Sequence, residues 1–164
     1  MLSHESLEEI FRELIGTSVK KLEADISPVI EEYMVDVTAG LATRPYLVSK
    51  VVYINDLLRT GLDSDGYIRR EYLRITGDMA LCISGIFPDS LESKKTAFNV
   101  GDYIDIGAIA YGNINVDIFD EMSEKFPEMV DILNLVSMKI TLTSIDLANY
   151  IKRRRIIDAR ASRK

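Results

Sequence analysis

The segment GDMALCISGIFPD, residues 77–89, sets a carboxylate at the head of an apolar run that ends in Phe-Pro. Proline disfavours helical geometry at the residue before it, so this pattern predicts a helix that ends near Phe87. Working back along the chain, apolar residues recur at steps of three or four, which predicts one long helix over 67–86. Its expected apolar line is Ile68, Tyr72, Ile75, Met79, Cys82 and Ile86.

Helix signals recur before this segment. Ser6 and Glu9 form a capping-box pattern, which predicts the start of a first helix. Ser27 followed by Pro28 is an N-cap and first-turn pair and opens a second helix. A third helix is expected over 45–61, followed by a turn with the sequence DSDG.

Helix signals also follow the segment. Asp102, as an N-cap with Asp105 at N3, is expected to open a helix that breaks near Gly112. Pro127 belongs to the first turn of a helix over 127–142 that is apolar nearly all round. A surface helix carries one apolar stripe, so this helix occupies either the centre of the bundle or a subunit interface.

The fold class that follows is all-α. The chain has 164 residues, of which 47% are hydrophobic and 28% charged, as in an ordinary globular domain. No repeat of 20–50 residues and no low-complexity linker occurs. We therefore expect a single-domain helical bundle of about seven to eight helices over residues 1–151, followed by a basic C-terminal helix end or tail over residues 152–164.

Charge is unevenly distributed. Residues 152–164 hold seven Lys or Arg and one acid, a net +6, which leaves −12 for residues 1–151. Such a tail is typical of binding to nucleic acid, an acidic membrane or an acidic partner, and equally of self-association or of a plain solvated helix end. The candidate anion-binding residues are Lys152, Arg153, Arg154, Arg155 and Arg160.

Several classes of protein are disfavoured by what the sequence lacks. The N-terminal segment lacks the basic region and the apolar region of a secretory signal peptide. No apolar run reaches the roughly 20 residues that a membrane helix needs. One histidine, His4, and one cysteine, Cys82, exclude the usual zinc sites. A calcium-loop pattern at 61–72 lacks its first aspartate and its last glutamate, and no phosphate-binding glycine motif occurs. We expect a soluble cytoplasmic protein without a cofactor and without a membrane partner.

Asp78 has a structural interpretation. Arg74 lies one helical turn before it, so an ion pair at i, i+4 is available. A line of small residues that includes Gly77 runs beside it, and a second one that includes Gly107 lies in the 100–112 segment. Glycine in a helix interior is unfavourable by about 1 kcal/mol relative to alanine. These lines predict that the two helices cross closely, backbone against backbone.

A functional interpretation is also open. Asp78, Asp102 and Asp105 could converge as ligands of Mg²⁺ or Mn²⁺, or two of them could act as an acid and a base. Tyr103 and Tyr111, eight residues apart, would line such a site, although tyrosines at helical spacing are also typical of a core or an interface.

The segments YLRITGDMALCISGIFPDSL (72–91) and VGDYIDIGAIAYG (100–112) resemble a family of small bacterial helical proteins. The family pattern is Tyr-x4-Gly-Asp-x2-Leu-x3-Gly-x-Phe-Pro, followed by Gly-x2-Ala-Tyr. The matching residues are Tyr72, Gly77, Asp78, Leu81, Gly85, Phe87, Pro88, Tyr103, Gly107, Ala110 and Tyr111. The resemblance implies a bacterial, cytoplasmic, all-helical protein and implies no activity.

The leading hypothesis is a non-enzymatic structural or protein-interaction domain that forms a homodimer. The alternatives are binding of nucleic acid or an acidic partner through the C-terminus, and a small-ligand or metal-dependent activity centred on Asp78 and Asp102. The residues predicted to form a functional or packing cluster are Arg74, Gly77, Asp78, Gly85, Asp102, Tyr103, Gly107 and Tyr111.

Overall fold

A computed structural model describes residues 4–43, 53–88 and 98–140 of the chain. Within these ranges the regular elements are helices and no strand occurs, so the predicted all-α class is confirmed. None of these helices combines the length and the apolar character that crossing a bilayer requires. The helices are α1 (His4–Leu22), α2 (Pro28–Thr43), α3 (Ile54–Asp63), α4 (Gly66–Gly85), α6 (Val100–Gly112), α7 (Asp117–Glu124) and a helix over 126–140.

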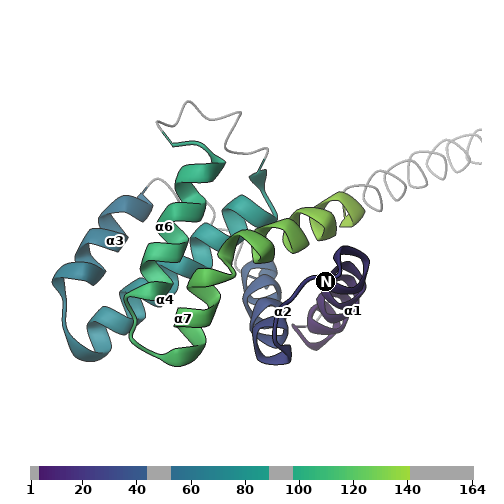
Figure 1. Ribbon diagram of the computed structural model, residues 1–164, viewed down its shortest axis with the longest axis horizontal. Helices are drawn as coiled ribbons and strands as arrows, with labels where there is room; N and C mark the ends of the chain where they lie inside the picture. The colour runs from purple at the N-terminus through teal and green to yellow at the C-terminus, as the bar shows by residue number, and fades with distance from the viewer. Residues whose placement is uncertain (1–3, 44–52, 89–97, 141–164) are drawn as a thin grey trace, which may run out of the picture.

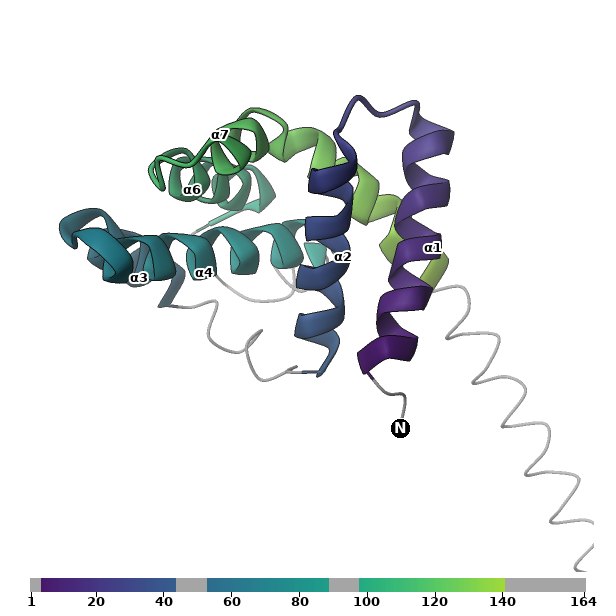
Figure 2. The same cartoon turned by 90° about the horizontal axis from the view of Figure 1, so that it is seen from below.

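Helix α4 is the element around which the others are arranged (Figure 1). It packs against α3, against α6 and against α2. Figure 2 shows α1 and α2 as an antiparallel pair that stands across α4, while α3 runs alongside it. The 126–140 helix extends from the end of α7 toward α1, where Lys139 donates to the hydroxyl oxygens of Thr17 at 3.1 Å and Ser18 at 3.2 Å.

Glycines on α4 and α6 make room for aromatic rings. A Cβ atom at Gly77 would overlap the ring of Tyr111, and one at Gly107 would overlap the ring of Phe126. The predicted close packing of these two helices is confirmed, but the expected backbone-to-backbone contact at the glycines is wrong. The missing side chains leave space that the rings of Tyr111 and Phe126 fill, because protein interiors are close-packed.

The buried side of α4 differs from the predicted apolar line. Met79 and Cys82 are buried as expected, but Ile68 is 58% exposed and Ile75 is 39% exposed. The neighbouring helices bring large side chains to α4, so the side that they cover is rich in small residues. The buried residues on this side include Thr76, Gly77, Ala80, Leu81 and Ser84.

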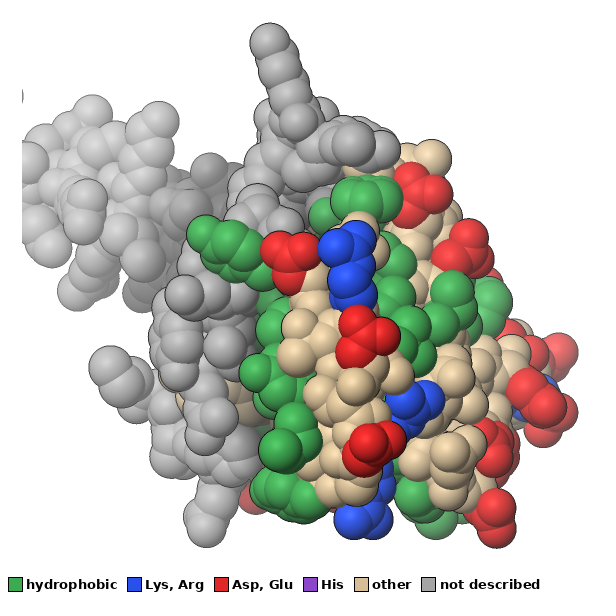
Figure 3. Space-filling view, turned by 90° about the vertical axis from the view of Figure 1, so that its left-hand side faces the viewer, with side chains coloured by type: hydrophobic (Ala, Val, Ile, Leu, Met, Phe, Trp, Pro, Cys, Tyr) green, Lys and Arg blue, Asp and Glu red, His purple; other side chains and the backbone are tan. Residues whose placement is uncertain are grey.

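The described surface at the α3 end of the molecule is mixed in character. In Figure 3, hydrophobic side chains there lie between acidic and basic ones. Apolar side chains exposed singly in this way are normal for a protein surface. This face therefore gives no reason to place a protein interface on α3.

The 126–140 helix packs against the bundle along one face, and its opposite face, which includes Asp131 and Met138, is exposed. Its buried apolar residues are Phe126, Met129, Val130, Ile132, Leu133 and Val136. The amide nitrogen of Asn134, in the orientation that satisfies it, donates to the carbonyl oxygen of Gly85 at 2.8 Å. Ser137 donates to the carbonyl oxygen of Ile86 at 2.7 Å. These side chains satisfy carbonyl groups that the end of α4 leaves without a helical partner. Its last described turn is less enclosed, since Met138 is 63% exposed.

Several predicted helix ends agree with the structure. Helix α2 begins at Pro28, and the hydroxyl of Ser27 accepts a hydrogen bond from the backbone N–H of Ile30 at 3.4 Å. Helix α4 spans Gly66–Gly85, within one residue of the expected range at each end. Helix α6 ends at Gly112, as predicted.

Other ends were predicted wrongly. Helix α1 begins at His4, so Ser6 lies inside it and is not its N-cap. The N-cap of α6 is Asn99, and Asp102 is the N3 partner in a reciprocal capping box. Helix α3 continues past Gly61 to Asp63, and its predicted start at residue 45 lies outside the described residues.

Helix α7 was not expected at all. No helix is predicted between Gly112 and Pro127, whereas α7 occupies Asp117–Glu124. It is short, and its N-cap residue, Val116, supplies no side-chain hydrogen bond. The local signals are a pair of acids in its first turn, which the helix dipole favours, and apolar residues at helical spacing, Ile118, Phe119 and Met122.

The ring of Tyr111 is fully buried, so it cannot move aside for a new methyl group. Gly77→Ala is therefore expected to lower the free energy of unfolding by about 1–3 kcal/mol, the range typical of overpacking. Gly40→Ala is the matched control, because its Cβ would meet nothing within 4 Å and alanine stabilises a helix by up to about 1 kcal/mol. Denaturant unfolding of both variants measures the difference, and equal effects would contradict the packing described above.

Candidate functional site

Three helices meet at the carboxylate of Asp78. The hydroxyl of Tyr33 on α2 and the hydroxyl of Tyr111 on α6 each donate to its Oδ1 atom at 2.7 Å. Arg74 on α4 donates from Nη1 to its Oδ2 atom at 3.1 Å. The Asp78 side chain is 18% exposed, so most of this carboxylate is removed from water. We call Tyr33, Glu71, Arg74, Asp78 and Tyr111 the Asp78 cluster.

The α4 part of the cluster is set by helical geometry. Residues three and four positions apart lie on the same face of a helix, so Arg74 reaches both neighbours. Its Nη2 atom lies 2.9 Å from Glu71 Oε2, and its Nη1 atom lies 3.1 Å from Asp78 Oδ2. The predicted Arg74–Asp78 ion pair is confirmed, and Glu71 is an additional partner that the prediction did not include.

Burial changes the acid–base behaviour of the cluster. It raises the pKa of Asp78 to about 6, against the lowering effects of the Tyr33 and Tyr111 hydrogen bonds and of Arg74. Burial and the charge of Asp78 also raise the pKa of both tyrosines. The tyrosines therefore stay neutral donors while Asp78 changes its charge near neutrality.

Aromatic rings enclose the two tyrosines. The ring of Tyr111 lies 5.5 Å from that of Phe119 and 5.6 Å from that of Phe126, centroid to centroid. The ring of Tyr33 stands edge-on to Phe119 at 5.6 Å and to Tyr111 at 6.3 Å. Helix α7 thus contributes Phe119 as a cover over both tyrosines, and the hydroxyl groups are held where they meet Asp78.

A cleft of about 380 Å³ lies beside the cluster, between α2 and α4. This volume falls in the range of small-molecule pockets in proteins. Asp78 and Arg74 form a polar part of its wall, and much of the rest is apolar. Its lining residues from α2 are Tyr33, Asp36, Val37, Gly40 and Leu41, and those from α4 are Arg74, Ile75, Asp78, Met79 and Cys82.

The carboxylate has acceptor capacity left over for a ligand. An ionised carboxylate has about four lone-pair sites. Its Oδ1 atom accepts two hydrogen bonds from the tyrosines and its Oδ2 atom accepts one from Arg74. One site therefore remains on Oδ2, on a side chain that borders the cleft. The arrangement can accept a hydrogen bond or a proton from a molecule bound there.

Half of the predicted site residues come together and half do not. Arg74, Gly77, Asp78 and Tyr111 meet in the Asp78 cluster or directly against it. The others pack or cap elsewhere: Gly85 against Leu133, Gly107 against Phe126, Tyr103 against Phe98, and Asp102 in the capping box of α6.

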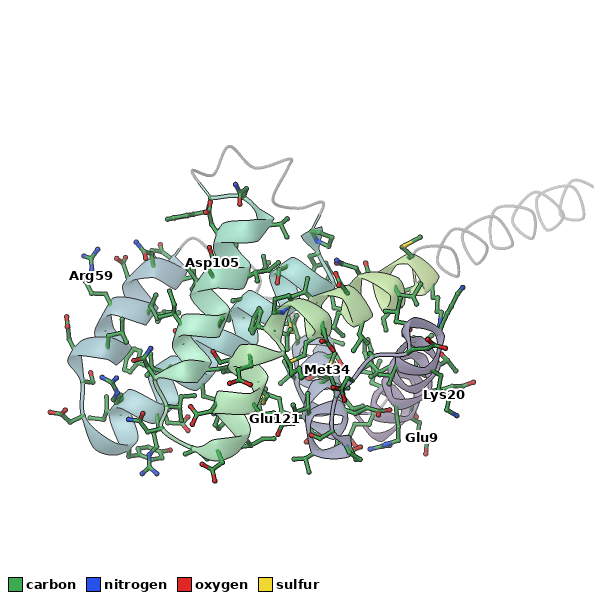
Figure 4. The ribbon with its side chains drawn as sticks, in the orientation of Figure 1. Glu9, Lys20, Met34, Arg59, Asp105 and Glu121 are labelled. Atoms are coloured by element: carbon green, nitrogen blue, oxygen red, sulfur yellow. The ribbon has the colours of Figure 1, made fainter. Side chains whose placement is uncertain are left out.

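The predicted convergence of Asp78, Asp102 and Asp105 is wrong. Asp102 lies nine residues before Tyr111 on α6, which is about 13 Å along the helix. Figure 4 places Asp105 on the part of α6 toward α3, well away from Met34, the residue next to Tyr33 on α2. Among the described residues, no three His, Cys, Asp or Glu side chains lie close enough to hold a metal ion.

Tyr33 is the functional residue that the sequence analysis missed. It lies 45 residues before Asp78, on a helix whose orientation nothing local determines. Cys82 is buried as predicted, and burial raises the pKa of its thiol, which keeps it protonated. The predicted anion-binding residues of the C-terminus lie outside the described residues.

Comparison of the chain with protein-family models, with curated proteins and with solved structures finds no match in any of the three. The resemblance to small bacterial helical proteins stays a prediction.

Tyr111→Phe keeps the ring and removes one donor to Asp78. We expect it to lower the free energy of unfolding by about 1.5–3 kcal/mol, the range for a hydrogen bond to a charged group. The pKa of Asp78 should rise above 6, because its ionised form loses a donor. Tyr103→Phe, at the other end of α6, is the control. Denaturant unfolding and an NMR titration of Asp78 check both effects, and an unchanged titration of Asp78 in Tyr111→Phe would contradict them.

Asp78 also makes stability depend on pH. Its pKa is about 6 when folded and near 3.8 in the unfolded chain, so the folded state holds the extra proton between these values. The contribution of Asp78 to the free energy of unfolding is therefore greatest below about pH 4. It is lost as pH rises through about 6, a change on the order of 3 kcal/mol.

The measurement is denaturant unfolding of the wild type and of Asp78→Asn across pH 4–8. Between pH 4 and pH 7 the wild type should lose stability relative to the variant. Glu32 and Glu71 have lowered pKa values and act in the opposite direction, but they are present in both proteins, so the difference isolates Asp78. Parallel curves for the two proteins would show that Asp78 does not titrate in this range.

Proposed function

We propose that the chain is a binding domain whose cleft between α2 and α4 takes up a small organic ligand, with Asp78 as its polar anchor. The observation that carries this proposal is a largely buried carboxylate that keeps a free acceptor site on the wall of a cleft of about 380 Å³. Apolar pockets with a few convergent polar groups and a residue of perturbed pKa are typical of binding sites.

The proposal narrows one of the alternatives that the sequence left open. It keeps Asp78 and removes Asp102, which serves α6 as a capping residue. It assigns binding and no reaction, because binding needs only the one anchoring carboxylate. A metal is not part of it, since the described residues offer no cluster of ligands for one.

The hypothesis of a homodimeric interaction domain receives less support from the described residues. Most apolar residues of the 126–140 helix are buried inside one chain, so they do not call for a partner subunit, while Leu135 is partly exposed and Met138 is 63% exposed. The space beside Gly77, Gly85 and Gly107 is likewise filled by side chains of the same chain. Dimer formation, a cytoplasmic location, a bacterial origin and binding of an anionic partner through 152–164 stay predictions.

Native mass spectrometry of the freshly purified protein tests whether a ligand is carried from the cell. A ligand-observed NMR screen with a library of small organic fragments tests the cleft itself. We expect fragments that bind the wild type and are displaced when the cleft is filled. The absence of any fragment that binds there would contradict the proposed function.

Gly40 provides the variant that fills the cleft without disturbing the core. A Cβ at this position meets nothing within 4 Å, so a larger side chain has room to extend into the cleft. Gly40→Leu should abolish fragment binding and remain folded, while Gly40→Ala should retain binding. Fragments that bind Gly40→Leu as well as the wild type would place their site elsewhere.

A further inference from the structure

Among the described residues, the wall of the cleft carries more negative charge than positive charge. The charged residues of this described lining are Asp36, Arg74 and Asp78. The guanidinium of Arg74 is already ion-paired with Asp78 and with Glu71, which lies just outside the lining. With Glu71 included, the described residues here are three carboxylates and one guanidinium, which contacts Glu71 and Asp78. A cation entering the cleft is therefore attracted, and an anion meets repulsion from both lining carboxylates.

The hydrogen-bonding groups of the cleft wall also favour a cation, because they accept hydrogen bonds more readily than they donate them. The hydroxyl hydrogens of Tyr33 and Tyr111 are both used by Asp78, so neither is available to an acceptor on a ligand. Asp78 keeps its acceptor site on Oδ2, and Asp36 adds a second carboxylate on the exposed side of α2. A ligand that donates hydrogen bonds fits this wall better than one that accepts them.

The remainder of the wall suits a hydrocarbon. Val37 and Leu41 from α2 face the same space as Ile75 and Met79 from α4. Ile75 is 39% exposed, so a ligand in the cleft would remove apolar surface from water there. The volume of about 380 Å³ matches a small molecule and is far too small for a folded partner.

We propose that the ligand of the α2–α4 cleft is a small organic cation, a protonated amine on a short apolar body. Its ammonium group donates to Asp78 Oδ2, and its apolar body lies against Val37, Leu41 and Met79. This inference rests on the proposed function, because it specifies the ligand class of the same cleft.

The ionisation of Asp78 gives the proposal a second signature. The groups that contact Asp78 are Arg74 on its own helix, Tyr33 from α2 and Tyr111 from α6. Tyr33 and Tyr111 stay protonated and Arg74 stays charged near neutrality, so Asp78 is the member of this group that titrates there. With its pKa at about 6, roughly one-tenth of Asp78 is ionised at pH 5 and nearly all at pH 7.5. An amine keeps its proton over this range, so only the receptor changes charge.

The experiment is an NMR titration of the full chain at low salt with hexylamine, 1-hexanol and hexanoate, three probes of equal length and different charge. At pH 7.5 we expect hexylamine to bind at least 10-fold more tightly than 1-hexanol, and hexanoate to bind more weakly than both. At pH 5 the affinity for hexylamine should fall about 10-fold, while that for 1-hexanol should not change.

Three variants locate the effect. Gly40→Leu should abolish binding of all the probes. Asp78→Asn should abolish both the preference for hexylamine and its pH dependence. Because loss of Asp78 can also impair folding, Asp36→Asn is a second test on an exposed residue, and it should weaken hexylamine severalfold and leave 1-hexanol unchanged.

The outcomes separate the ligand class from the proposed function. If 1-hexanol or hexanoate binds as tightly as hexylamine and Gly40→Leu abolishes that binding, the cleft is a binding site but the amine class is wrong. If hexylamine binding is indifferent to Gly40→Leu, or if no probe binds, both proposals fail. A preference for hexylamine that depends on pH, on Asp36 and on Gly40 supports both.

Discussion

The carboxylate of Asp78 is the interaction on which the arrangement of the helices depends. Removing a carboxylate from water is unfavourable by several kcal/mol unless donors replace the lost hydration. Those donors come from three different helices, Tyr33 on α2, Arg74 on α4 and Tyr111 on α6. Any displacement of α2 or α6 along α4 would leave the charge buried with a donor missing. The cluster therefore specifies the register of three helices, which apolar packing alone would define less sharply.

The adjacent residues Gly77 and Asp78 work as a unit. The ring of Tyr111 occupies the space that a side chain at Gly77 would take, and the hydroxyl of the same ring reaches Asp78. The glycine thus sets how closely the ring approaches α4, and the aspartate fixes its direction. Phe119 and Phe126 close around the ring and complete its burial. An ordinary amphipathic helix face would require neither Gly77 nor Asp78. Their roles in placing Tyr111 explain why these two residues interrupt the apolar pattern of α4.

Sequence reasoning succeeded where a feature is determined within one or two helical turns. The Arg74–Asp78 pair, the start of α2 at Pro28 and the end of α4 before Pro88 all follow from local geometry. It failed where the partner comes from a distant part of the chain. Tyr33 and Tyr111 lie 45 and 33 residues from Asp78, and neither spacing carries information about orientation. The same limit explains why the exposure of Ile75 and the rings opposite the glycines were not foreseen. Periodicity identifies an apolar residue without saying which neighbour covers it.

Stabilising the fold and binding a ligand are compatible roles for one carboxylate. Here one site on Oδ2 remains, and the cleft reaches the carboxylate. A cation in the cleft would stabilise the ionised form of Asp78, and so it would offset part of the unfavourable burial of that charge. A molecule that binds only the folded state also raises its stability. Occupancy of the cleft and the packing of α2 and α6 on α4 are therefore thermodynamically linked through the same oxygen atoms.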